Sequence, residues 1–179
     1  CDLICRYHGR VATTQQTGSA SNPGNHGTKT PELHLEFYSR PGYLAVIRHM
    51  IDALCGRLGF TPAESSQICL AIDEALCNII RHGYDSSPDG RIYLSINEWL
   101  EEGMLEFIIE DDAKQVDIDT IRSRDLDDVR PGGLGVHLIS EIMDEVTYDH
   151  RPHRGMRMTT RKRLPASGNE GQKTPGADA

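Results

Sequence analysis

The sequence lacks the features that would place it in several broad classes. No apolar run approaches the roughly 18 residues that a membrane-spanning helix needs, and no secretory signal is visible. An excess of positive charge is also absent, because the net charge is −8 and the isoelectric point is about 5.4. We therefore expect neither membrane attachment nor direct nucleic-acid binding.

The five cysteines form no Cys-x-x-Cys pair. Cys55, Cys69 and Cys77 fall inside helical patterns, where a small buried thiol that packs as an apolar residue is the usual explanation. This usage is typical of a reducing compartment, so the sequence predicts a cytoplasmic protein.

A length of 179 residues suits one domain, since typical domains run to roughly 100–200 residues. Residues 9–31 consist mostly of Gly, Ser, Thr, Gln, Asn and Pro, and they hold too little apolar surface to offset the entropy of ordering. We predict a disordered N-terminal segment over residues 1–31, a folded domain over 32–164 and a disordered tail over 165–179.

Within the folded span, the apolar period switches between two and about 3.6 residues. Thr61-Pro62-Ala63-Glu64 is a capping box with Pro at the first helical position, so it marks a helix start. The patterns predict strands near 33–37, 92–96, 104–110, 146–150 and 155–163, and helices near 41–58, 62–82 and 135–143. Because strands run in adjacent pairs, we expect an α+β two-layer sandwich: a mixed sheet with helices on one face. A doubly wound parallel sheet fits less well, since βαβ alternation is missing.

The second predicted helix carries a polar stripe between apolar flanks. Glu74, Asn78 and His82 recur at i, i+4 and i+8, which places them on one face. A carboxylate and a carboxamide one turn apart can hold a proton acceptor beside a hard cation, as phosphate chemistry requires. The alternative is a partly solvated helix face with no chemical role.

Glycines precede the third predicted helix, in the run Gly132-Gly133-Leu134-Gly135. Glycine permits a close approach of the backbone, and a helix start exposes unpaired N–H groups, so the combination favours a phosphate. No Lys-Ser or Lys-Thr follows, which excludes a Walker P-loop, and the GxGxxG spacing of a dinucleotide fold is missing. The alternative is a glycine-rich turn into an ordinary helix.

A buried strand, Phe107-Ile108-Ile109, ends in the carboxylates of Glu110, Asp111 and Asp112. A carboxylate at a strand end can accept a hydrogen bond from an exocyclic amine such as that of adenine. The alternative is a solvated turn.

These three motifs, in this order, resemble those of the GHKL superfamily of ATP-binding proteins, which includes gyrase, histidine kinases and MutL. Within it, the stretch from Asp73 to Tyr84 is most similar to the small anti-sigma-factor serine/threonine kinases. Pro131-Gly132-Gly133-Leu134-Gly135 and Ile142-Met143-Asp144-Glu145-Val146 also match that group. The resemblance covers residues 32–164 and implies the Bergerat ATPase fold.

The resemblance also implies roles for individual residues. Glu74 would be the general base, Asn78 would bind Mg²⁺ beside the nucleotide, and Asp111 would bind the adenine amino group. The phosphates would lie against Gly133, Leu134 and Gly135.

Two further residues have roles that the sequence leaves open. Residues 113–131 would form a lid over the nucleotide, from which Arg130 either reaches a phosphate or remains a solvated loop residue. His82 is either a site residue or a hydrogen-bonded partner at the helix end.

By resemblance, the chain uses ATP and Mg²⁺ to phosphorylate a Ser or Thr of an anti-anti-sigma partner of the STAS type. It would also bind a sigma factor and, like other members of the group, form a homodimer. These expectations describe an anti-sigma factor with protein kinase activity.

One departure from the family supports a different function. The family continues from its strand-end Asp as Asp-x-Gly, but the third residue here is Ala113, whose methyl group could crowd the base or restrict the backbone. The alternative is therefore a non-catalytic or weakly nucleotide-binding module that sequesters a partner. A histidine kinase catalytic module is disfavoured, because no phosphoacceptor helical hairpin precedes residue 32.

Overall fold

The computed structural model describes residues 32–118, 121 and 134–166. Their strands form a five-stranded sheet in the order β1-β2-β3-β5-β4. The strands are β1 (Leu33–Tyr38), β2 (Arg91–Trp99), β3 (Met104–Asp111), β4 (Glu145–His150) and β5 (Met156–Arg163). All four pairs of neighbouring strands among them are antiparallel.

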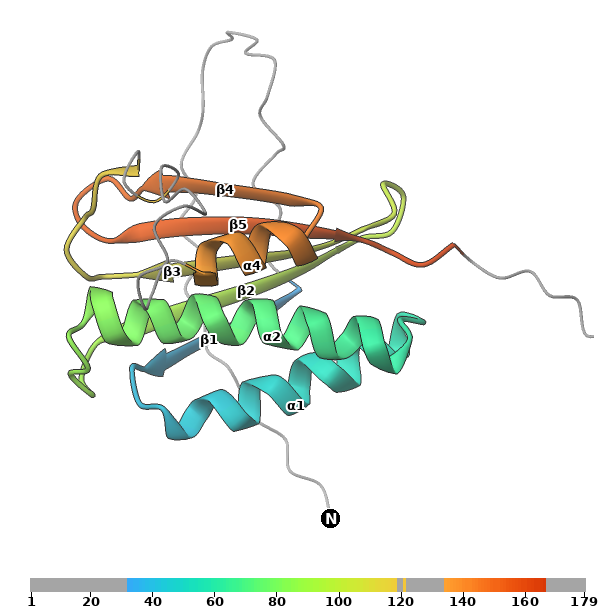
Figure 1. Ribbon diagram of the computed structural model, residues 1–179, viewed down its shortest axis with the longest axis horizontal. Coiled ribbons are helices and arrows are strands. Elements are labelled where there is room, and N and C mark those ends of the chain that lie inside the picture. Colours follow the sequence, from blue (N-terminus) through green and yellow to red (C-terminus); the bar gives the residue numbers. More distant parts are fainter. Residues whose placement is uncertain (1–31, 119–120, 122–133, 167–179) are drawn as a thin grey trace, which may run out of the picture. The chain divides into compact units, whose positions relative to one another are not determined.

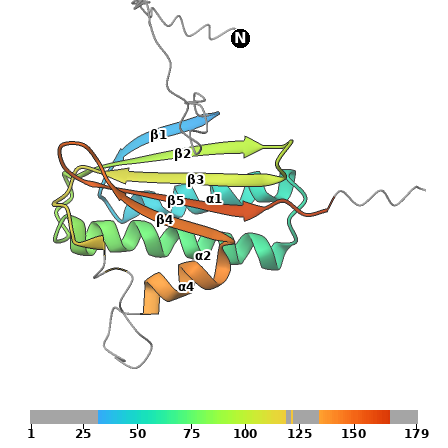
Figure 2. The same cartoon turned by 90° about the horizontal axis from the view of Figure 1, so that it is seen from above.

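The helices lie on one face of this sheet (Figure 1). They are α1 (Gly42–Arg57), α2 (Pro62–Asn78) and α4 (Leu134–Ile142). The view from above shows the sheet and the helices as two layers (Figure 2). In both views α2 lies between α1 and α4, and it contacts both helices.

The core between the layers follows from the alternation along the strands. Ile92, Leu94 and Ile96 of β2 are buried because they point to the helix side, where the apolar stripes of α1 and α2 meet them. Alternate residues of β2 and β3 point to the other side of the sheet, and there Glu106 is paired with Arg161 of β5.

Helix α2 begins as its sequence predicts. The Thr61 hydroxyl accepts a hydrogen bond from the backbone N–H of Glu64, and the Glu64 carboxylate accepts one from the backbone N–H of Thr61. This reciprocal capping satisfies two of the donors that a helix start leaves unpaired.

The end of α2 differs from a regular helix. A π-helical turn, η1 (Ile79–Gly83), continues it, and the Tyr84 N–H donates to the Ile79 carbonyl at 3.0 Å. Such wide turns are frequent at functional sites. The turn ends at Gly83, one residue beyond the predicted helix.

The predicted fold class, an α+β sandwich with helices on one face, is confirmed. The expected mixture of parallel and antiparallel pairs is wrong for the described strands. The pairs β2–β3 and β4–β5 are antiparallel because a short connection joins the two strands of each hairpin. β5 also runs antiparallel to β3, its other neighbour. The predicted disordered segments, residues 1–31 and all but the first two residues of 165–179, lie outside the described residues. The domain boundaries therefore stay predictions.

Among the described residues, no helix is both long and apolar enough to cross a bilayer.

Candidate functional site

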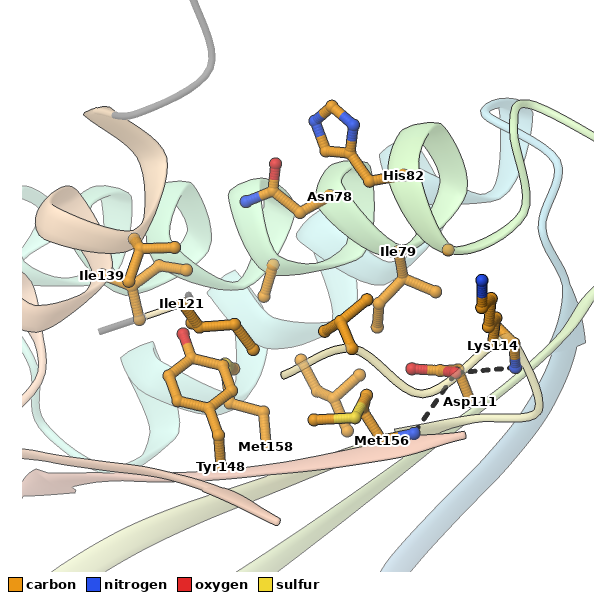
Figure 3. Close-up of a pocket in the computed structure, with 16 residues that line it drawn as sticks. Asn78, Ile79, His82, Asp111, Lys114, Ile121, Ile139, Tyr148, Met156 and Met158 are labelled. Atoms are coloured by element: carbon orange, nitrogen blue, oxygen red, sulfur yellow. Dashed lines mark hydrogen bonds between the residues drawn. The ribbon is translucent and has the colours of Figure 1, made fainter. Parts of the chain in front are cut away.

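A cavity of about 210 Å³ lies where the end of α2 faces the sheet and α4 (Figure 3). Most of its walls are apolar, which suits a flat organic group better than a bare ion. The wall residues from the helices and strands include Ala75, Ile79, Ile109, Val136, Ile139, Tyr148, Met156 and Met158.

Asp111 is the buried carboxylate of this cavity, with 4% of the residue exposed. Its Oδ1 atom accepts hydrogen bonds from the backbone N–H groups of Ala113, at 2.8 Å, and Met156, at 3.4 Å. Burial raises the pKa of Asp111, and these two donors and nearby Arg151 oppose that rise. Oδ2 has no hydrogen-bond partner in the described part of the chain and points toward the cavity (Figure 3). The carboxylate can therefore accept one hydrogen bond from a bound amine.

The next carboxylate along the chain, Asp112, lies outside the cavity. Its Oδ1 accepts a hydrogen bond from Arg151 at 2.5 Å, and its Oδ2 accepts one from the Tyr93 hydroxyl at 2.9 Å. The Asp112 backbone N–H donates to the Tyr84 hydroxyl at 2.7 Å. Of the two adjacent aspartates, only Asp111 can bind a ligand in the cavity.

Glu74 and Gly135, 61 positions apart in the sequence, are in direct contact. A Cβ atom added to Gly135 would lie 1.9 Å from Oε1 of Glu74, so only glycine leaves room for this carboxylate. Gly135 belongs to the first turn of α4, where unpaired N–H groups and the positive end of the helix dipole lie. The structure thus brings the acidic residue of the helix motif to the glycine motif.

Asn78 and His82 both line the cavity and come from α2 and η1 (Figure 3). Both side chains project to the side of the helix away from the sheet (Figure 3). Asn78 is half-buried and His82 is exposed. His82 contributes to the cavity wall, but its exposed side chain projects away from the sheet, so both possibilities for His82 stay predictions.

Ala113, the departure from the family pattern, is buried in the cavity wall with 3% of the residue exposed. It is not among the described residues with a positive φ, so its backbone needs no glycine. A Cβ atom added to Gly83 would lie 3.1 Å from the Ala113 methyl group, so there is room for one methyl group between these two positions. Gly83 therefore accommodates Ala113.

Three of the predicted site residues are described incompletely or not at all. Gly133 and Arg130 lie outside the described residues, as does most of the predicted lid over 113–131. Leu134 is described only as the first residue of α4.

Several residues of the site carried no recognisable signal in the sequence. Tyr148 is half-buried in the cavity wall, and burial raises its pKa to about 12. Lys114 lies exposed at the cavity rim. Met156 and Met158 lie in the strand predicted over 155–163, but their place in the cavity depends on β5 lying beside β3.

Residues 37–162 match the family described as histidine kinase-like ATPase domain. The chain belongs to this family. The match covers more than half of the chain and nearly all of its described part, and it agrees with the three motifs that the structure brings to one site.

The curated relatives point to one group within the family. The serine-protein kinase RsbW of Bacillus subtilis is 28% identical over 140 residues, which cover 74% of this chain and 85% of that protein. The anti-sigma F factor of Bacillus velezensis is 29% identical over 141 residues, covering 76% of this chain and 94% of that one. RsbW of Halalkalibacterium halodurans is 32% identical over 112 residues, or 58% and 67% of the two chains. The predicted membership of the anti-sigma-factor kinase group is confirmed.

One solved structure supports the fold. The RsbU and RsbW domains of Rv1364c from Mycobacterium tuberculosis match with a TM-score of 0.52 and 18% identity, over 75% of this chain and 32% of that longer one. At this identity the likeness concerns the fold alone.

Proposed function

We propose that the protein is an ATP-dependent serine/threonine kinase that acts as an anti-sigma factor. It would phosphorylate a Ser or Thr of an anti-anti-sigma partner of the STAS type and bind a sigma factor. The names of its relatives, serine-protein kinase and anti-sigma F factor, support this proposal.

The contact of Glu74 with Gly135 is the observation that carries the proposal. It places a potential proton acceptor at the first turn of α4, where a phosphate would be favoured. Phosphoryl transfer depends mainly on positioning and charge stabilisation, so a base beside a phosphate-binding helix start is the arrangement that a kinase needs.

The cavity supports ATP as the phosphate donor. Its apolar walls suit a purine, and the free oxygen of Asp111 can accept a hydrogen bond from the adenine amino group. Glu74 would accept the proton of the incoming hydroxyl group, while backbone N–H groups near Gly135 would stabilise the phosphate oxygens.

The residues present also fit Mg²⁺, which supplies charge neutralisation at the phosphates when bound. Asn78 offers a carboxamide oxygen on the same helix as Glu74, one turn away. Within the described part of the chain, no three His, Cys, Asp or Glu side chains come together as a metal cage. Mg²⁺ does not need one, because it is usually held by one or two protein oxygens together with phosphates and water.

A homodimer in the cytoplasm belongs to the same proposal. β1 lies at one end of the described strand order, and exposed apolar side chains lie on it and on neighbouring α1, namely Leu33, Tyr38, Tyr43 and Val46. A dimer interface at β1 and α1 would cover these side chains.

The compartment rests on the cysteines: Cys55, Cys69 and Cys77 are free thiols, which fits a reducing compartment.

The test combines binding and transfer. ATP is titrated by calorimetry with and without Mg²⁺, using the wild type and Asn78→Ala. Transfer of the γ-phosphate is then measured to a STAS-domain protein from the same organism, using the wild type, Glu74→Gln and Asp73→Asn. Asp73 is a matched control, because it is the neighbouring carboxylate but pairs with Arg48 of α1.

We expect Mg²⁺-dependent binding that weakens in Asn78→Ala, and transfer that only Glu74→Gln abolishes. Full transfer by Glu74→Gln would exclude Glu74 as the base. ATP binding by the wild type without transfer to any STAS-domain protein would favour the non-catalytic module instead. Ala113 has no positive φ, so the backbone part of the reason for that alternative does not apply, while its methyl group still lines the cavity.

A further inference from the structure

Arg151 makes several contacts around the end of β3, although it follows β4. Its Nη1 donates to the Asp111 carbonyl at 2.6 Å and to Oδ1 of Asp112 at 2.5 Å. Its Nε lies 3.3 Å from Oε1 of Glu110, and its guanidinium group lies 5.2 Å from the centre of the Tyr93 ring. One side chain thus contacts three consecutive residues, the middle one being Asp111.

Arg151 contacts β3 at the point where the pairing of β3 with β5 ends. The ladder between β3 and β5 ends at the pair Glu110 and Arg157, so Asp111 has a strand partner only on its β2 side. The turn that follows Arg151 supplies the other side. Gly155 has φ +83° and approaches so closely that an added Cβ would lie 1.8 Å from the Asp111 carbonyl oxygen.

His150 and Arg151 also form hydrogen bonds with Gln115 and Val116, which follow Asp111 in the chain and begin the predicted lid. The Gln115 side chain donates to the Arg151 carbonyl at 2.6 Å. The His150 ring contacts the Val116 carbonyl through Nε2 at 2.8 Å. Residues 112–116 are therefore bonded to the end of β4 at both of these points.

Arg151 does not line the cavity, so it would not touch a nucleotide there. From these contacts we infer that Arg151 is a positioning residue: it holds the Asp111 carboxylate in the orientation that selects an amino-bearing purine, and it holds residues 112–116 beside it. This inference rests on the proposed function, because it assigns the means by which the same site distinguishes its base.

Arg157 provides a matched control. It also pairs with Glu110, at 2.9 and 3.0 Å, but makes no contact with Asp111 or Asp112. Replacing Arg157 therefore removes a guanidinium group from the same carboxylate and leaves Asp111 in place. A general loss of charge near β3 would affect both variants, whereas a positioning role belongs to Arg151 alone.

The first experiment needs no nucleotide. Hydrogen exchange of the backbone amides of residues 111–116 is followed in the free wild type, Arg151→Ala and Arg157→Ala. The Ala113 N–H, which donates to Asp111, should exchange at least about tenfold faster in Arg151→Ala and at the wild-type rate in Arg157→Ala. Equal exchange in the two variants would overturn the inference, whatever the protein binds.

The second experiment compares ATP with inosine triphosphate, which lacks the exocyclic amine. In Arg151→Ala, the preference for ATP should fall roughly tenfold by loss of ATP affinity, with the affinity for inosine triphosphate almost unchanged. Arg157→Ala should keep the preference. An unchanged preference in Arg151→Ala would contradict the inference.

Two further outcomes keep the inference separate from the proposed function. If the wild type binds neither nucleotide, the proposed function fails, and the exchange experiment alone decides whether Arg151 holds Asp111. If Arg151→Ala does not fold, Arg151→Lys replaces it. A lysine ammonium group can still donate to the Asp111 carbonyl and to Asp112, but it loses the separate Nε contact with Glu110 and the planar group over the Tyr93 ring, so both effects should persist at smaller size.

Discussion

Replacement of Gly135 by alanine tests whether the glycine motif serves Glu74. The added Cβ would lie 1.9 Å from Oε1, 2.7 Å from Cδ and 2.9 Å from Cγ of Glu74. These atoms belong to the outer part of a flexible side chain, so the carboxylate turns away and the backbone stays in place. The displacement is on the order of 1 Å, enough to cost about 10²-fold in rate for a group that must be positioned.

The same substitution should not weaken the fold. Alanine in a helix is more stable than glycine by about 0.5–1 kcal/mol, so the free energy of unfolding should stay constant or rise slightly. Urea denaturation measures this quantity, and the initial rate of phosphate transfer at saturating ATP measures the loss. We expect a folded protein whose transfer rate is about 10²-fold lower than that of the wild type.

Gly56→Ala is the control, because Gly56 is an exposed residue of α1 with no other side chain within 4 Å of an added Cβ. It should leave transfer unchanged. The double variant Glu74→Gln/Gly135→Ala should be no slower than Glu74→Gln alone, since both changes remove the same group. Wild-type transfer by Gly135→Ala, or a further large loss in the double variant, would refute the reasoning.

Three other perturbations have defined outcomes. Glu106→Gln should lower the free energy of unfolding at pH 7 by roughly 1–3 kcal/mol, because the carboxylate is buried against Arg161. Burial raises the pKa of Glu106, but hydrogen bonds from Asn97, Arg161 and Trp99 outweigh it and hold the pKa low. The stabilisation by the Glu106 carboxylate is therefore fully present above the pKa that Glu106 has in the unfolded state, and it is lost as the pH falls through the lower pKa of the folded state. The free energy of unfolding of Glu106→Gln should therefore decrease less on acidification than that of the wild type. ATP affinity should weaken on acidification at a higher pH than an ordinary Asp would cause, because burial raises the pKa of Asp111 and the ionised carboxylate is the stronger acceptor for the amine; calorimetry with inosine triphosphate should lack this step. Ala113→Gly should improve binding of N6-methyl-ATP relative to ATP by roughly tenfold, since it removes a methyl group from the cavity wall; unchanged relative affinity would place the base elsewhere.

Local signals in the sequence were sufficient for the elements and for the three motifs. The capping box from Thr61 to Glu64 and the apolar period of α2 depend on residues within one or two turns of each other. The alternation in β2 and β3 similarly reflects which face of each strand is buried. For this reason the element order, the α+β class and the positions of Glu74, Asn78 and Asp111 could be predicted.

Tertiary structure alone decided how these pieces combine. The antiparallel pairing of β3 with β5 and the contact of Glu74 with Gly135 both join residues whose relative placement no local pattern encodes. The π-helical turn η1 also has no signal in the apolar period. The roles of Glu74, Asn78, His82, Asp111 and Gly135 stay predictions, as do those of Gly133, Leu134 and Arg130.

The clearest case is Arg151, which lies 40 positions from Asp111 and contacts its backbone carbonyl. Every residue has a backbone carbonyl, so a hydrogen bond to this group does not depend on the type of the residue that accepts it. Sequence therefore determined which groups are candidates for the chemistry, because their types and spacing are local. Only the fold determined what holds them in place, because support comes from whichever chain segment the packing brings alongside.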